Sequence, residues 1–132
     1  MYKLSLPIYY TQHFKTKKDK TFLVGMNVYR NAHYFLQNEL KKHYHKLVIS
    51  LLSDFKGDTL TSYRVKYKLY YKNPSCDLDN IVSLIGKFLN DSLQDLKIIK
   101  NDNVKIFTRY SAEVIEKDVD NPRLEIEIEE NL

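Results

Sequence analysis

The sequence predicts a small α/β or α+β domain in which two main helices pack on one mixed β-sheet, in the order β-α-β-α-β-β. Three observations favour this fold. Residues 62–72 and 123–129 alternate apolar and polar side chains, as half-buried strands do. Residues 28–50 and 79–93 instead repeat apolar side chains at helical spacing. Helices interleaved with strands in this way are typical of a sheet covered by helices.

The first half of the chain begins with a predicted strand at residues 2–10, which Pro7 limits to a sheet edge or to an early end. A charged loop follows at residues 15–20, and a short apolar run near Phe22 is consistent with an extra strand. The long first helix is expected to begin at Asn27, because Asn favours the N-cap position.

The strand at residues 62–72 has one apolar and one basic face, and the basic face has two interpretations. It could contact phosphates, or it could form a salt ladder with the acidic face of the last strand. If the two strands are neighbours, the ladder accounts for the basic face. The opposing charges are Arg64, Lys66 and Lys68 on one strand and Glu125, Glu127 and Glu129 on the other.

Three aspartates lie near the two ends of the second helix. Asp77 and Asp79 stand where the strand-like run ends and the helix at 79–93 begins, and Asp102 follows the helix, before a strand predicted at 104–115. We expect their carboxylates to form a hard-oxygen site for a divalent cation. The alternative is that Asp77 or Asp79 only caps the helix, since Asp favours that position too.

These residues resemble the signature of a known family, the RusA-type Holliday junction resolvases. The matching segments are Asp77-Leu78-Asp79-Asn80, Asp91-Ser92-Leu93, Ile98-Ile99 and Asn101-Asp102-Asn103-Val104. Two earlier segments, Leu4-Ser5-Leu6-Pro7 and Asn27-Val28-Tyr29-Arg30, resemble the opening strand of the family and its Asn/Tyr segment before the first helix. The resemblance therefore extends over nearly the whole chain.

The resemblance implies a crossover junction endodeoxyribonuclease that uses Mg²⁺, with Mn²⁺ as an alternative ion. It implies a homodimer that resolves branched DNA by paired nicks in recombination and repair, and a phage or bacterial source. By the same resemblance, Asp77, Asp79 and Asp102 are both the metal ligands and the catalytic residues. Two rival functions stay open: a flap- or fork-specific nuclease, and a DNA-binding protein of the same fold that has lost catalysis.

Three segments depart from the pattern of the family. The family often has D-D where this chain has Asn101-Asp102, so only Asp102 is carried over. Family members carry basic residues just before D-L-D-N, where this chain has Asn73-Pro74-Ser75-Cys76, and a Lys one helical turn after the second Asp, where this chain has Ser83. Lys72 or Lys87 is an alternative source of that charge. The departures bear on junction preference and catalytic strength more than on the metal site.

The charge distribution also favours a DNA partner. Residues 1–74 contain 14 Lys and Arg against 4 Asp and Glu, whereas residues 75–132 contain 7 against 13. A basic half is the electrostatic footprint expected of a protein that binds a polyanion, although a solvated charged loop at residues 15–20 is an equally good interpretation there. The predicted DNA-binding residues are Lys15, Lys17, Lys18, Lys20, Asn27, Arg30, Arg64, Lys66, Lys68, Lys72 and Lys87.

Composition narrows the class of protein further. A single Cys excludes an internal disulfide framework. No apolar stretch approaches the roughly 20 residues that span a bilayer, and the first residues lack the apolar core of a signal peptide. We therefore expect a single cytoplasmic domain with no membrane partner, and the resemblance implies that the cell is bacterial or phage-infected.

Overall fold

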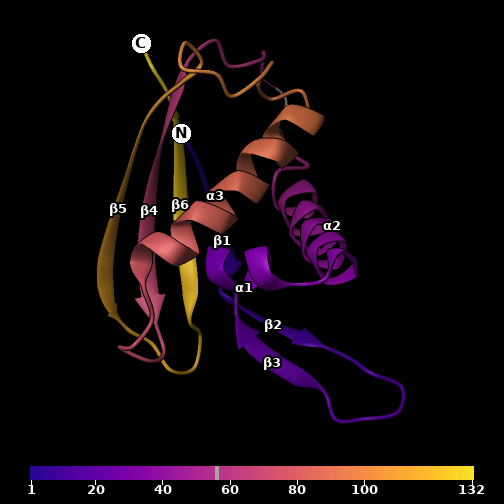
Figure 1. Ribbon diagram of the computed structural model, residues 1–132. Coiled ribbons are helices and arrows are strands. Elements are labelled where there is room, and N and C mark those ends of the chain that lie inside the picture. Colours follow the sequence, from indigo (N-terminus) through magenta and orange to yellow (C-terminus); the bar gives the residue numbers. More distant parts are fainter. Residues whose placement is uncertain (56) are drawn as a thin grey trace.

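A four-stranded mixed sheet carries the helices on one of its faces (Figure 1). The computed structural model describes residues 1–55 and 57–132. The strand order is β1 (Tyr2–Pro7), β6 (Arg123–Glu130), β4 (Tyr63–Tyr71) and β5 (Phe107–Lys117). Strand β5 runs parallel to β4, and the other neighbours are antiparallel. The predicted α+β fold with a mixed sheet is thus confirmed.

Helix α3 (Leu78–Asp95) connects the two parallel strands and lies on the sheet. Its buried stripe includes Ile81, Ile85 and Leu89, which are 0 % exposed, so the predicted amphipathic helix is confirmed. In a parallel β-α-β connection the helix runs back along the sheet, antiparallel to both strands. Residues before and after α3 therefore lie toward opposite ends of the sheet, as Figure 1 shows.

The predicted first helix is two helices, α1 (Met26–Asn31) and α2 (Tyr34–Leu51). The break falls at Ala32 and His33, whose backbone is extended, with ψ 149° at both residues. The His33 ring caps α2, because its Nδ1 accepts a hydrogen bond from the backbone N–H of Phe35 at 3.2 Å. The prediction of one continuous helix capped by Asn27 was wrong, and Gly25 is the N-cap of α1.

The predicted first strand is divided at Ile8. Its second part, β2 (Tyr9–Gln12), pairs with β3 (Lys20–Leu23) in a separate two-stranded sheet, which includes the extra strand expected near Phe22. Ile8 is 0 % exposed, and its carbonyl accepts a hydrogen bond from Val24 N–H at 2.8 Å. This contact fixes the base of the β2–β3 hairpin, which projects away from the main sheet (Figure 1).

Tyrosines fill much of the space between the sheet and the helices. Tyr44, Tyr63 and Tyr67 are almost fully buried, and burial raises the pKa of all three. Two of their hydroxyls find partners: Tyr44 donates to the carbonyl of Pro7 and Tyr63 to Asn90 Oδ1, each at 2.6 Å. Within residues 1–55 and 57–132, no helix has the length and apolarity needed to cross a membrane.

Candidate metal centre and nucleic-acid interface

The first two aspartates lie together at the start of α3. Asp77 is the N-cap residue, and its Oδ1 accepts a hydrogen bond from Asp79 N–H at 3.2 Å. Asp79 lies in the first turn, and both side chains are exposed. Their negative charges suit the positive end of the helix dipole. Asp77 therefore caps the helix, as the alternative interpretation expected, and Asp79 lies exposed in the first turn next to it.

Asn80 joins this helix start to α1. Its Oδ1 accepts a hydrogen bond from the backbone N–H of Asn27 at 2.8 Å. A methyl group on Gly25 would lie 2.1 Å from Asn80 Nδ2, so only glycine allows this close approach. The D-L-D-N segment and the Asn27 segment, both part of the family resemblance, are thus adjacent in space.

Asp102 lies elsewhere along α3. It lines a cavity of about 340 Å³ between α3 and β5, together with Ser83, Lys87 and Asn90. Among the residues that the structure describes, no group of three or more His, Cys, Asp or Glu side chains could hold a metal ion. The structure therefore brings Asp77 and Asp79 together but does not add Asp102 to them, and the shared cation stays a prediction.

One face of α3 runs from Asp79 to the cavity that Asp102 lines. Asp79, Ser83, Lys87 and Asn90 recur at three- or four-residue spacing and so lie on the same side of the helix. Asp79 and Asn90 are about 16 Å apart along the helix axis. Lys87 lies between them, with its Nζ 5.2 Å from the centre of the Tyr29 ring in α1. Lys87 thus lies about two helical turns from Asp79 and lines the same cavity as Asp102.

Asp91 lies in the second half of α3, on the neighbouring turn. Burial raises the pKa of its carboxyl group, Lys87 lowers that pKa, and the negative charge of Asp102 raises it again. These opposing influences place Asp102 and Lys87 near this part of the helix, away from its start.

The β2–β3 hairpin carries four of the predicted DNA-binding lysines, all exposed: Lys15, Lys17, Lys18 and Lys20. Near its base, the Tyr10 hydroxyl donates a hydrogen bond to Glu39 of α2. Burial, and then the nearby Cys76, raise the pKa of the Tyr9 hydroxyl. Lys72 Nζ is 5.7 Å from the centre of the Tyr9 ring. The hairpin thus joins the body of the molecule next to the residues that precede Asp77.

An exposed aromatic cluster marks the junction of α1 and α2. The rings of His33, Tyr34 and Phe35 have centres 4.3–4.9 Å apart. Tyr34 and Phe35 remain 57 % and 67 % exposed, and Arg30 lies in the last turn of α1. Sequence reasoning missed this cluster, because composition cannot separate core rings from exposed ones. The break at Ala32 is the feature that leaves these rings in solvent.

The basic face of β4 has a different environment. Strand β6 is its neighbour, and Arg64, Lys66 and Lys68 lie opposite Glu129, Glu127 and Glu125. Ion pairs join Arg64 to Glu129 at 2.9 Å and Lys68 to Glu127 at 3.5 Å. The condition for the salt ladder is therefore met, and these cations are better explained by their glutamate partners than by DNA.

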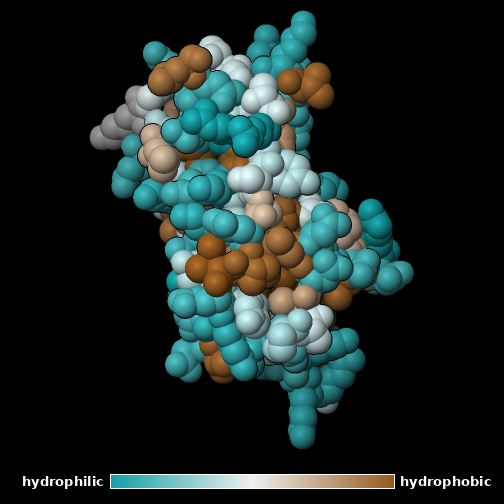
Figure 2. Space-filling view, turned by 90° about the vertical axis from the view of Figure 1, so that its left-hand side faces the viewer, coloured by the Kyte–Doolittle hydropathy of each residue, from teal (hydrophilic) through white to brown (hydrophobic). Residues whose placement is uncertain are grey.

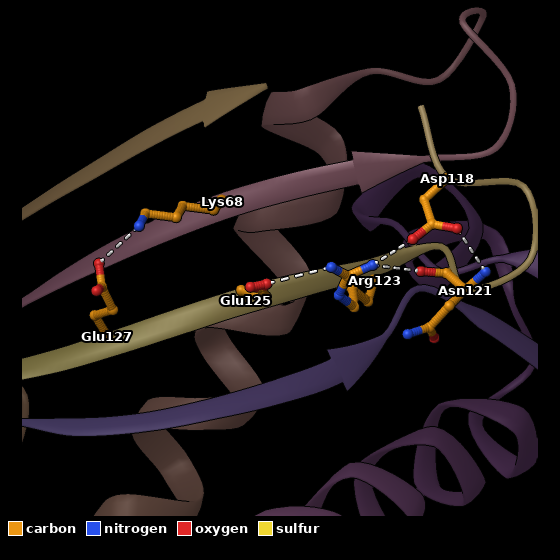
Figure 3. A network of polar contacts seen from close by, with 6 residues as sticks. All are labelled: Lys68, Asp118, Asn121, Arg123, Glu125 and Glu127. Carbon is orange, nitrogen blue, oxygen red and sulfur yellow. Dashed lines mark hydrogen bonds and ion pairs between the residues drawn. The ribbon is translucent and has the colours of Figure 1, made fainter. Parts of the chain in front are cut away.

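The ladder continues to the end of β6 (Figure 3). Arg123 contacts Asp118 at 2.7 Å and Glu125 at 3.4 Å, and its guanidinium lies 3.8 Å from the centre of the Tyr70 ring. The hydrogen bond from Arg123 is the main reason that the pKa of Asp118 is lowered. Along β4 and β6, Arg64, Lys68 and Arg123 of this face are therefore each paired with an acidic side chain.

Neither the family models nor the curated proteins compared with the chain include a match to it. The resemblance to the RusA-type resolvases therefore rests on the quoted segments and their order.

Proposed function

We propose that the chain is an Mg²⁺-dependent endodeoxyribonuclease that resolves four-way DNA junctions by paired nicks, as a homodimer. The observation that carries this proposal is the exposed carboxylate pair of Asp77 and Asp79 at the start of α3. The lysine-bearing hairpin joins the molecule beside Cys76, immediately before this pair. Carboxylates that hold a cation next to lysines that hold phosphates are what DNA hydrolysis requires.

The donor atoms suit Mg²⁺, or Mn²⁺ in its place. Mg²⁺ prefers carboxylate oxygens, keeps several waters, and is commonly held by one or two carboxylates together with substrate phosphates. Asp77 and Asp79 supply two such groups. When bound, the ion would activate a water and offset charge on the attacking and leaving oxygens. The role of Asp102 in the proposal rests on the resemblance alone.

The surrounding side chains have separate roles in the proposal. Asn80 holds α1, which carries Arg30 in its last turn, against the start of α3. Lys87 supplies positive charge on the same face of α3 as Asp79. The exposed rings of Tyr34 and Phe35 offer flat surfaces on which unpaired bases could stack at a branch point.

A second candidate function is DNA binding without cleavage. It is favoured by the position of Asp102, which does not join the acidic pair, and by Ser83, which replaces the family Lys. The lysines of the hairpin serve this function equally well. Only the requirement for the two carboxylates separates the two candidates.

The test compares Asp77→Asn and Asp79→Asn with the parent protein. Asn is as good an N-cap as Asp, so Asp77→Asn should leave the helix intact while it removes a metal ligand. Nicking rates in Mg²⁺ are measured on junction, flap and linear duplex DNA, and the junction Kd is measured in EDTA. Asp58→Asn, at an exposed position outside the helices and strands, is the matched control.

We expect both variants to lose nicking by about 10³-fold or more, because the cation is lost from the reacting phosphate. Their junction affinity in EDTA should hold or rise, since a repulsive charge is gone. If the parent binds junctions but nicks no substrate in Mg²⁺ or Mn²⁺, the second candidate is correct. If the parent nicks and both variants nick at its rate, the carboxylates are only helix-start charges and the proposed metal site is wrong.

A further inference from the structure

Strand β5 is an edge of the sheet that the rest of the molecule leaves uncovered. The opposite edge, β1, is six residues long and contains Lys3 and Pro7, which discourage strand pairing. By contrast, β5 is eleven residues long, and Tyr110 and Val114 are 56 % and 52 % exposed. Figure 2 faces this side of the molecule and shows a hydrophobic patch there. A long exposed edge strand presents unpaired backbone N–H and C=O groups that can pair with another strand.

The charges of β5 also lack partners within the sheet. Arg109 lies opposite Arg64 of β4, a like-charge pair that is destabilising, while Arg64 itself binds Glu129. Glu113 lies opposite Lys68, which binds Glu127 instead. In the described part of the chain, neither Arg109 nor Glu113 forms an ion pair. Each is therefore available to a group of opposite charge outside this chain.

We propose that a second copy of this chain pairs with β5, antiparallel and edge to edge, about a two-fold axis at Ser111. In this register Arg109 lies opposite Glu113 of the partner subunit, and the symmetry forms the pair twice. Tyr110 then lies opposite Ala112 of the partner subunit, where a small side chain leaves room for the ring. The sequence Arg109-Tyr110-Ser111-Ala112-Glu113 is thus complementary to itself.

Neighbouring registers lose this complementarity. An axis at Ala112 would place Arg109 opposite Ile115, and an axis at Glu113 would place two glutamates face to face and Arg109 opposite Lys117. The irregular positions of the β4–β5 pair lie outside the pairing segment, between Phe107 and Arg109 and between Val114 and Glu116. The segment that would pair is therefore regular as well as self-complementary.

The pairing has a consequence for the proposed site. A two-fold axis perpendicular to the sheet keeps the helices of both copies on the same face, so two α3 helices flank the joined β5 strands. The cavity that contains Ser83 and Lys87 opens between α3 and β5, which places the two copies of it on either side of the joined strands. This inference deepens the proposed function, because a four-way junction is itself nearly two-fold symmetric. The interface argument does not depend on that function.

Sedimentation of charge variants tests the register. Arg109→Glu places Glu opposite Glu, and Glu113→Arg places Arg opposite Arg, each twice. We expect either single variant to weaken the dimer at least about tenfold, since opposed like charges are costly at an interface. The double variant Arg109→Glu with Glu113→Arg should restore the parental association. Lys46→Glu, an exposed reversal on α2, should leave it unchanged.

Two results would overturn the inference. One is a parent that stays monomeric up to about 100 µM, where a symmetric pair of useful strength must form. The other is a double variant that associates no better than the singles although circular dichroism shows all of them folded. Because no DNA is present, these results are independent of nicking. The nuclease proposal can thus fail while the dimer stands, and a double variant that does not associate would reject this register without bearing on nicking.

Discussion

Two regions of this protein have similar basic sequences and opposite surroundings. The outer face of β4 carries Arg64, Lys66 and Lys68, and every one of them lies opposite a glutamate of β6. The hairpin carries four exposed lysines, and the one acid among them, Asp19, contacts His13 at 2.9 Å. Local sequence is therefore a poor guide to which cations are free. The neighbouring strand decides whether a row of lysines is available to DNA.

The largest expected effect follows from removing the hairpin charge. A variant with Ala in place of Lys15, Lys17, Lys18 and Lys20 should bind junction DNA about 100-fold more weakly at low salt, because up to four phosphate contacts are lost. The slope of log Kd against log salt should fall by about three to four for the same reason. Fluorescence anisotropy over a salt series measures both quantities.

The matched control changes the β4 cations to Ala. If that variant loses as much junction affinity and as much salt dependence as the hairpin variant, the β4 cations also contact DNA, and the two basic regions do not differ in this respect.

A smaller effect is expected when the ladder itself is cut. Arg64→Ala should lower the free energy of unfolding by about 0.5 kcal/mol, because an ion pair between partly exposed side chains contributes little. Junction affinity should stay within about twofold, since no phosphate contact is lost. Urea denaturation and anisotropy measure the two quantities. Lys66→Ala is the control. Lys66 lies opposite Glu127, but the carboxylate of Glu127 contacts Lys3 and Lys68 instead, so we expect this change to leave those ion pairs intact.

A complementary variant changes the acidic partner of the ladder instead of the cation. Converting Glu127 to Gln removes the partner of Lys3 and Lys68, and a rise in affinity would show that pairing alone keeps DNA from this face.

The smallest effect concerns how the hairpin is held. Burial and the hydrogen bond to Glu39 raise the pKa of Tyr10 to about 12, so its neutral form is favoured in the folded protein. The stabilisation is fully present below the ordinary Tyr pKa of about 10 and is lost as the pH rises toward 12. Tyr10→Phe should therefore lower the unfolding midpoint at pH 8, and the difference from the parent should shrink above pH 10.

Thermal unfolding across this pH range provides the measurement. Tyr34→Phe, which changes an exposed ring, should show no such pH-dependent difference. An equal difference in both variants would contradict a specific role for the hydrogen bond between Tyr10 of the hairpin and Glu39 of α2.

Much of the fold could be predicted because period and charge are local properties. The alternation in β4 and β6 predicted two strands, and their opposite charges already indicated a salt ladder as one of two interpretations. The apolar stripe of α3 likewise predicted its length to within a few residues. The break between α1 and α2 could not be predicted, because Arg30, Asn31 and Ala32 all fit a helix. The hydrogen bond from Phe35 to the His33 ring is a structural feature that no periodicity shows.

The site was predicted less well, for a geometric reason. In the sequence, Asp102 comes soon after α3, and we predicted that it shares a cation with Asp77 and Asp79 at the start of that helix. The helix is 18 residues long, about 27 Å, and it runs back along the sheet between two parallel strands. Residues that follow it therefore approach from the far end. The pair Asp77 and Asp79 was predictable because both belong to one short segment at a helix start.

The pairing of β1 with β6 also affects how the protein folds. Tyr2 lies opposite Ile128 and Pro7 opposite Arg123, so the sheet joins segments that are separated by almost the whole chain. A ribosome makes β1 first, and β1 has no partner in the sheet until β6 has been made. Closing so long a loop is entropically costly and slows folding. We expect β1 to be the last strand to join the sheet, with Leu4 and Leu6 unprotected from solvent and from chaperones until β6 has been made.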